Sequence, residues 1–142
     1  MIRHQHDQTR QQPATTSDIE TSVLAARFFD AIERGRIDEV QAIYAPDAVI
    51  WHNTDQQATS AAENLEVLRA FIGLIDDRRY IERRLQVFPG GFVQQHILTG
   101  TRRDGVCLAL HACIVCQVRH GRITRLDEYF DSLAVDPWWV TS

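Results

Sequence analysis

The chain has 142 residues, enough for one domain that buries a core and a ligand cavity, and its formal net charge is −4 at pH 7. This negative charge, without a basic stripe along the sequence, argues against a nucleic-acid-binding surface. No apolar run is long enough to span a bilayer, and the polar residues 1–16 lack the apolar stretch of a secretory signal, so a cytoplasmic protein with no membrane partner is expected.

The chain has three cysteines, an odd number without the spacing of a disulfide framework, which fits a reducing compartment. Cys113 and Cys116 lie in an apolar segment that favours a strand, where a separation of three places them on opposite faces. A zinc site needs more ligands nearby and a redox pair favours a helix N-terminus, so we interpret both as small hydrophobic residues. No metal ion or organic cofactor is expected.

Residues 1–16 are expected to form a flexible tail, and residues 17–142 a single domain. The Ser-x-x-Glu capping box at residues 17–20 predicts the start of a helix. Its apolar residues recur with helical spacing until Gly35, a natural helix stop. A second, short helix is predicted at residues 38–44.

Pro46 ends this second helix and precedes a short predicted strand at residues 48–53. After a loop, a second Ser-x-x-Glu capping box begins at Ser60 and opens a third helix that runs to about Ile75. The charged residues 76–79 are expected to form a solvated turn.

From residue 80 onward the pattern changes to strands. Four are predicted, at residues 80–88, 92–102, 106–118 and 122–131, separated by short turns that contain glycine. Helices followed by a run of antiparallel strands indicate an α+β fold. Three N-terminal helices can cover one face of such a sheet, and a strongly curved antiparallel sheet forms a cone whose apolar interior is either a small-molecule pocket or a filled core.

Glu128 is the strongest functional clue in the sequence. In the last predicted strand, alternation places Leu126, Glu128 and Phe130 on one face and Asp127 on the other. A carboxylate between two apolar neighbours is costly to bury unless the protein pairs it, neutralises it or uses it. We predict that Glu128 is a general acid or base in a pocket. An ion pair with an arginine is the alternative, and Asp127 replaces Glu128 if the strand phase is shifted by one residue.

His96 is the second candidate. In the strand at residues 92–102, alternation places Gln94, His96 and Leu98 on one face, but the opposite face is equally mixed, so the sequence alone leaves the inward face open. An imidazole titrates near neutral pH and can act as a general acid or base. The alternative is a histidine held by one hydrogen bond in the core or exposed at a dimer contact.

Several short motifs suggest a family. Phe-Phe-Asp-Ala-x-x-x-Gly at residues 28–35 leads to Tyr-Ala-Pro-Asp-Ala-Val at residues 44–49, and Gly-Arg-Ile-Thr at residues 121–124 leads to Tyr-Phe-Asp at residues 129–131. With these motifs the chain resembles the SnoaL-like branch of the nuclear transport factor 2-like (ketosteroid isomerase-like) superfamily over roughly residues 18–133. The resemblance implies the curved α+β fold with an apolar pocket.

Within this superfamily the pattern is most similar to limonene-1,2-epoxide hydrolase. The aromatic-x-Asn motif of that family corresponds to Trp-His-Asn at residues 51–53, with Trp51 in place of the usual tyrosine. Its last strand corresponds to residues 128–131, so its catalytic carboxylate falls on Glu128. Its Arg-x-Asp pair corresponds to Gln-x-His at residues 94–96, and the Asp-Arg-Asp triad of the epoxide hydrolases is therefore absent.

The resemblance implies that the Gln94–Leu98 face points inward and that His96 and Glu128 form an acid–base pair. Asn53 is predicted as a third catalytic residue that orients water or holds a substrate carbonyl, with a strand-ending turn residue as the alternative. The predicted substrate-binding residues are Tyr44, Trp51, Gln94, Leu98, Leu110, Ala112, Leu126 and Phe130.

Tyr44 is expected to donate its hydroxyl to a ligand oxygen. Trp138 and Trp139 are expected either to fold over the mouth of the pocket or to form a subunit contact. His52 is predicted to point away from the pocket, opposite Trp51 and Asn53. His111 is placed on the outer sheet face, which is the usual dimer surface of the superfamily, so a homodimer through that face is expected.

These residues favour an enzyme that transfers a proton on a small apolar or carbonyl-containing molecule, of the isomerase, cyclase or hydratase type, without a cofactor. One alternative is a non-catalytic ligand-binding or dimerisation module, because one fold hosts many roles. Another is activation of water by a His/Glu pair, as in an epoxide or ester hydrolase.

Overall fold

The computed structural model describes residues 16–139. Its helices are α1 (Thr16–Arg34), α2 (Ile37–Ile43), α3 (Ala61–Leu74) and α4 (Ser132–Val135), and the 3-10 helix η1 (Asp136–Trp139) follows α4. Its strands are β1 (Tyr44–His52), β2 (Ala58–Ser60), β3 (Ile75–Phe88), β4 (Gly91–Arg102), β5 (Cys107–Arg119) and β6 (Arg122–Phe130). Except for Thr16, which begins α1, the tail predicted at residues 1–16 lies outside the described residues.

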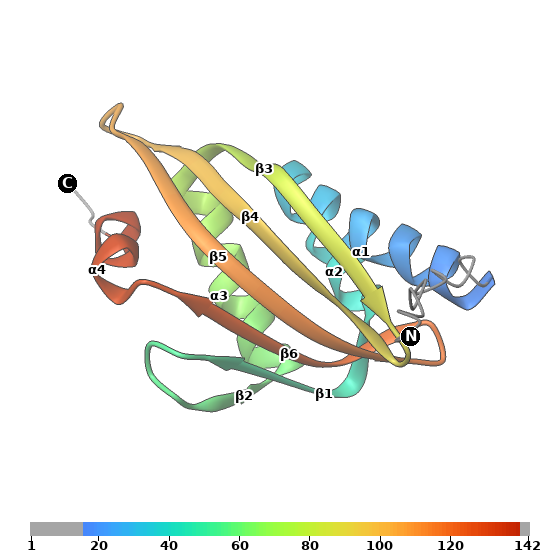
Figure 1. The fold of residues 1–142 in the computed structure, drawn as a ribbon. Coiled ribbons are helices and arrows are strands. Elements are labelled where there is room, and N and C mark those ends of the chain that lie inside the picture. The colour runs from blue at the N-terminus through green and yellow to red at the C-terminus, as the bar shows by residue number, and fades with distance from the viewer. Residues whose placement is uncertain (1–15, 140–142) are drawn as a thin grey trace, which may run out of the picture.

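The strands form one curved, open sheet in the order β2-β1-β6-β5-β4-β3, and α1, α2 and α3 cover one of its faces (Figure 1). Neighbouring strands are antiparallel except β1 and β6, which run parallel. The predicted α+β fold, with a curved sheet against N-terminal helices, is confirmed. The sheet is mixed rather than wholly antiparallel, because β1, which follows α2 in the chain, pairs in parallel with the last strand, β6. Within residues 16–139, no helix is both long and apolar enough to cross a membrane.

Aromatic residues of α1 anchor the helices on the sheet. Phe28 and Phe29 are 2% and 0% exposed, and the Phe29 ring meets the ring of Phe92 from β4 edge-on, with 6.4 Å between centroids. Each buried phenylalanine contributes about 2–3 kcal/mol through the apolar area that it removes from water. The helical spacing of apolar residues in α1 therefore fixes which side of the helix faces the sheet.

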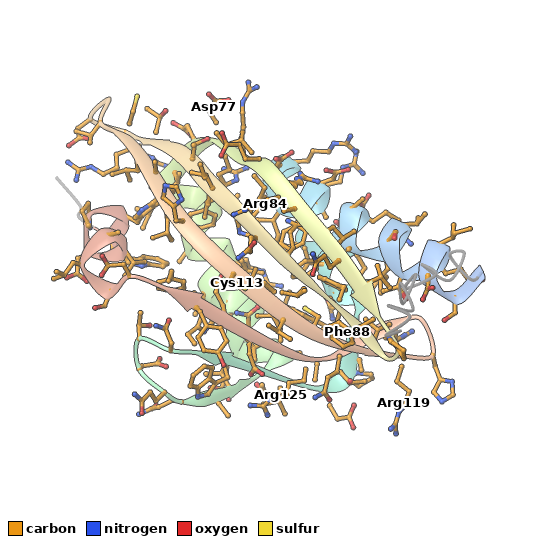
Figure 2. The ribbon with its side chains drawn as sticks, in the orientation of Figure 1. Asp77, Arg84, Phe88, Cys113, Arg119 and Arg125 are labelled. Carbon is orange, nitrogen blue, oxygen red and sulfur yellow. The ribbon has the colours of Figure 1, made fainter. Side chains whose placement is uncertain are left out.

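Strand β5 alternates as its sequence predicts. Leu110, Ala112 and Ile114 are buried under the helices. His111 is exposed on the opposite, outer face. Cys113 is half-buried on that same face (Figure 2). This alternation defines the inner face of the sheet, against which a ligand can be enclosed.

Helix α3 begins as predicted, at a capping box. The Ser60 hydroxyl accepts a hydrogen bond from the backbone amide of Glu63 at 3.2 Å. The end of α2 is one residue earlier than predicted, at Ile43, and Pro46 lies inside β1. Pro46 falls where the register with β6 shifts, between Tyr44 and Val49, so its missing N–H interrupts no regular ladder.

The charged residues 76–79 are part of β3, not a turn. Asp77 has a positive φ of 51°, and the register with β4 shifts between Asp76 and Arg79. The one extra residue on β3 forms a bulge, so the strand continues through this charged segment.

The bulge aims the Arg78 side chain at the ends of two helices. Its Nε and Nη2 donate to the carbonyl oxygens of Ile32 and Glu33 in the last turn of α1, at 3.2 and 3.1 Å. Its Nη1 donates to the carbonyls of Ile72, near the end of α3, and of Ile75. One guanidinium thus donates to carbonyls at the ends of two helices, and its positive charge is favourable beside both helix C-termini.

We expect R78M to lower the free energy of unfolding by about 3 kcal/mol, because buried carbonyl oxygens lose a charged donor. Chemical denaturation measures this loss. R79M is the control, since the Arg79 guanidinium is exposed and pairs with the exposed Asp77, and it should change stability by less than about 0.5 kcal/mol. Equal effects of the two substitutions would contradict the role of Arg78.

Candidate functional site

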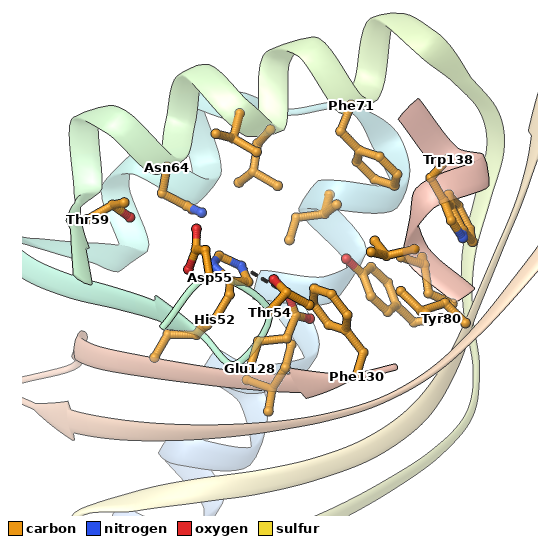
Figure 3. Close-up of a pocket in the computed structure, with 18 of the residues that line it drawn as sticks. His52, Thr54, Asp55, Thr59, Asn64, Phe71, Tyr80, Glu128, Phe130 and Trp138 are labelled. Atoms are coloured by element: carbon orange, nitrogen blue, oxygen red, sulfur yellow. Dashed lines mark ion pairs between the residues drawn. The ribbon is translucent and has the colours of Figure 1, made fainter. Parts of the chain in front are cut away.

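The parallel pairing of β1 with β6 brings together two titratable side chains. His52 is the register partner of Glu128, and both side chains line the pocket on the helix-covered side of the sheet (Figure 3). His52 Nε2 lies 3.2 Å from Glu128 Oε1, and the two side chains are 23% and 20% exposed. This hydrogen-bonded pair is an ion pair whenever the imidazole is protonated.

Asn53 fixes the register that makes this pair. Its Nδ2 donates to the carbonyl of Phe130 and its Oδ1 accepts from the amide of Phe130, each at 3.0 Å. Its own backbone amide donates to the carbonyl of Glu128 at 3.0 Å. Asn53 was predicted to be catalytic, but both ends of its side-chain amide are bound to backbone and it does not line the pocket. Its geometry is that of a clamp at the strand end.

A pocket of about 290 Å³ lies between the inner sheet face and the helices. This volume suits a small molecule, since ligand sites are of the order of 300–1,000 Å³. The walls are mostly apolar and aromatic. Of the predicted substrate-binding residues, the pocket is lined by Tyr44, Leu98, Leu110, Leu126 and Phe130.

The C-terminal helices lie at the end of the pocket opposite His52 (Figure 3). Trp138 is 3% exposed and its ring packs against Phe71 with 6.0 Å between centroids, while Trp139 also lines the pocket. Gly100 of β4 makes room for this packing, because a Cβ there would lie 3.1 Å from the Trp138 ring. The structure places both side chains along the pocket, whereas the alternative role in a subunit contact stays a prediction.

Tyr44 and Asn64 form a second polar pair on the pocket wall. The Tyr44 hydroxyl donates to Asn64 Oδ1 at 2.8 Å, and the two residues are 3% and 6% exposed. Burial, followed by the nearby Cys116 and Glu128, raises the pKa of Tyr44 well above its ordinary value, so its hydroxyl keeps its proton. The expectation that Tyr44 donates to a ligand is corrected, because that single proton is already shared with Asn64.

His96 lies behind the pocket wall rather than on it. The ring is 3% exposed, its Nδ1 is 3.0 Å from Gln94 Nε2, and its Nε2 has no partner within the described residues. It packs edge-on against Phe29 and Tyr80, with centroids 5.2 and 4.8 Å apart, and Tyr80 itself lines the pocket. Burial lowers the pKa of His96 to about 4, outweighing the nearby Glu128 charge, so the ring is neutral at pH 7. The predicted His96–Glu128 pair is therefore replaced by His52–Glu128.

Three further predicted residues do not line the pocket. Trp51 points to the outer face, where its ring meets that of Tyr129 at 5.3 Å between centroids. The phase predicted for β1 was therefore wrong by one residue, which exchanges Trp51 for His52. Gln94 and Ala112 face inward but are buried in the core, at 2% and 8% exposure.

Sequence reasoning missed His52 and Asn64, although each left a signal. Ala48 and Ile50 are buried residues of β1, and continuing their alternation predicts that His52 also points inward. Asn64 falls at helical spacing within the apolar stripe of α3, four residues before Leu68. A polar residue in an apolar stripe suggests a functional role for the same reason as Glu128 does in its strand, because burying it is costly.

The His52 imidazole is tuned by the carboxylates around it. Burial alone would lower its pKa, but the hydrogen bond to Glu128, the charge of Glu128 and the charge of Asp55 together raise it above the ordinary 6.5. The protonated ring thus contributes stability that is fully present below pH 6.5 and is lost as the pH rises through the folded-state pKa.

We expect E128Q to lower the His52 pKa below that of the native protein, because the substitution removes two of the three influences that raise it and leaves burial in place. A titration of the His52 ring by NMR measures this shift. An unchanged pKa would show that the pair seen here does not persist in solution.

His96 gives a second pH dependence, with the opposite sign. The unfolded chain binds a proton near pH 6.5, whereas the folded ring binds one only near pH 4. Stability is therefore lost as the pH falls from 6.5 to about 4, by roughly 3 kcal/mol in total. H96L should lack this loss in denaturation curves measured across that range. H120N, at an exposed turn with positive φ that asparagine tolerates, should retain it.

Comparisons with known proteins agree with this architecture. The sequence profile of the SnoaL-like domain family matches residues 25–126. A search of curated protein sequences finds no match. Similar solved structures include a candidate polyketide cyclase from Xanthomonas campestris pv. campestris, with 17% identity and a TM-score of 0.72 over 80% of this chain and 91% of that one.

Two further structures are similarly close. The LEH-like epoxide hydrolase of M. tuberculosis has 19% identity and a TM-score of 0.69 over 84% of this chain and 89% of its own. An NTF2-like protein of unknown function from Burkholderia pseudomallei has 16% identity and a TM-score of 0.74 over 86% and 98% of the two chains. At such identities the likeness establishes the fold alone, while the profile covers most of the sequence. The chain therefore belongs to the SnoaL-like domain family.

Proposed function

We propose that this protein is an enzyme that transfers a proton on a small, uncharged, largely apolar molecule bearing a carbonyl group, with Glu128 as the base. The observation that carries the proposal is a carboxylate in an apolar pocket, held through one oxygen by a histidine. Among residues 16–139, Glu128 Oε1 has His52 as its side-chain partner and Oε2 has none. That second oxygen is available to a substrate proton.

The charges around the pocket support an uncharged substrate. All fifteen basic residues outside the histidines are arginines, and none of those within residues 16–139 lines the pocket. Glu128 and Asp55 both lie on its wall, and His52 is the residue there that can balance them. A carboxylate or phosphate on the substrate would meet net repulsion without a guanidinium to pair with.

The proposed reaction needs only the groups on the pocket wall and, for exchange, water. Glu128 Oε2 takes a proton from the carbon beside the carbonyl, and the electron pair of the broken C–H bond moves to give an enolate. If the carboxylic acid returns this proton to another carbon, the reaction is an isomerisation. If it first exchanges the proton with water and then protonates the original carbon, the result is exchange with solvent. His52 holds the carboxylate in place through the other oxygen.

Activation of water is a second candidate function, favoured by the position of the pair. About a fifth of each side chain of His52 and Glu128 is exposed, and Asp55 beside them is exposed, so water can reach this end of the pocket. Glu128 could then deprotonate a water molecule that attacks an epoxide. The M. tuberculosis protein of similar fold is described as an LEH-like epoxide hydrolase.

Exchange of the protons beside the carbonyl of 2-tetralone, followed by NMR in D₂O, tests the main proposal. The native protein should accelerate the exchange, and E128Q should reduce that acceleration by about 100-fold or more, a loss typical for a general base. E66Q, which changes an exposed glutamate on α3, should behave as the native protein does. Binding without any acceleration would indicate a non-catalytic ligand-binding module, and diol formation from an epoxide would select water activation.

A further inference from the structure

Asn64 is a polar side chain buried in the apolar stripe of α3. It is 6% exposed and lies within the apolar stripe that contains Ala61, Leu65 and Leu68. An asparagine at such a site costs stability, both because it is a poor helix former and because its amide must leave water. A leucine would fill this position without either cost. Because Asn64 lines the pocket, a role in binding a ligand there would explain the amide.

One end of the Asn64 amide is bound and the other is free. Oδ1 accepts the hydroxyl proton of Tyr44 at 2.8 Å, which fixes the orientation of the amide. Nδ2 has no hydrogen-bond partner among residues 16–139, and it is not among the enclosed polar atoms that lack one. In Figure 3 the side chain extends from α3 into the pocket, with its nitrogen at the tip on the side of His52 and Asp55. Two N–H donors therefore face the space that a ligand would occupy.

We propose that Asn64 binds the carbonyl oxygen of the substrate through its Nδ2 N–H groups, and that Tyr44 is the positioning residue that holds this amide. The proposal rests on the proposed function and names the group that would receive the charge. When Glu128 removes the neighbouring proton, negative charge develops on the carbonyl oxygen, and a fixed N–H donor at that oxygen stabilises it. The N-terminus of α3, where the helix dipole is positive, lies close to this amide, since Asn64 is the fourth residue of the 14-residue helix.

The arrangement assigns complementary roles to two walls of the pocket. The β6 side supplies the base, Glu128, and the α3 side supplies the donor, Asn64. The apolar residues between them hold the rest of the molecule by burial rather than by hydrogen bonds. The preferred ligands are therefore ketones with an apolar ring system, rather than the corresponding hydrocarbons or carboxylates.

The test compares 2-tetralone with tetralin, which has the same two rings without the oxygen. Dissociation constants for both are measured by calorimetry on the native protein, N64L, N64D and Y44F. The native protein should prefer the ketone, and N64L should weaken ketone binding by about tenfold while changing tetralin binding by less than about twofold. N64D keeps the oxygen that accepts from Tyr44 but loses both donors, so it should lose the same preference.

Y44F should lose part of the ketone preference, because the amide is no longer held in one orientation. E66L, which places the same leucine on the exposed face of α3, should keep the full preference. The proposal would be overturned if a folded N64L or N64D still prefers the ketone, or if it binds both ligands more weakly by the same factor. E128Q should keep the ketone preference while losing proton exchange. The test of Glu128 as the base and the test of Asn64 as the donor therefore have different readouts, and either proposal can fail without the other.

Discussion

The clamp that Asn53 places on β6 is the constraint on which the site depends. Its side-chain amide donates to the carbonyl of Phe130 and accepts from the amide of Phe130, and its backbone amide donates to the carbonyl of Glu128. A parallel strand pair at this point needs such a lock, because a slip of one residue would turn every side chain of β1 to the other face. With the clamp in place, His52 and not Trp51 meets Glu128.

Charge is distributed unevenly between the scaffold and the pocket. Arginines stabilise the scaffold, as Arg78 does at the ends of α1 and α3 and Arg83 does with Asp30 and Glu33. Among the described residues, the wall of the pocket instead carries two carboxylates and a single histidine, with mostly apolar neighbours. Outside the pocket, guanidinium groups bind backbone carbonyls and carboxylates. On the pocket wall, as far as residues 16–139 are concerned, the Glu128 carboxylate has His52 and no arginine as its partner.

The two histidines near the pocket have opposite roles for one physical reason. His96 is enclosed by the rings of Phe29 and Tyr80 and has no carboxylate in contact, so burial keeps it neutral. His52 is less buried and touches Glu128, so its positive charge is favoured. The first therefore makes the folded state sensitive to acid, and the second gives the pocket a titratable group whose pKa lies above the ordinary 6.5.

The sequence by itself determined the α+β class, the capping box of α3 and the alternation of β5 and β6, because these depend on local spacing and on the free energy of burying apolar side chains. Alternation alone also placed Glu128 on the inner face. Only the tertiary structure decided that His52 is its partner, that Tyr80 separates His96 from the pocket, and that Tyr44 holds Asn64. Each of these depends on the register between segments far apart in the chain, which local periodicity does not encode.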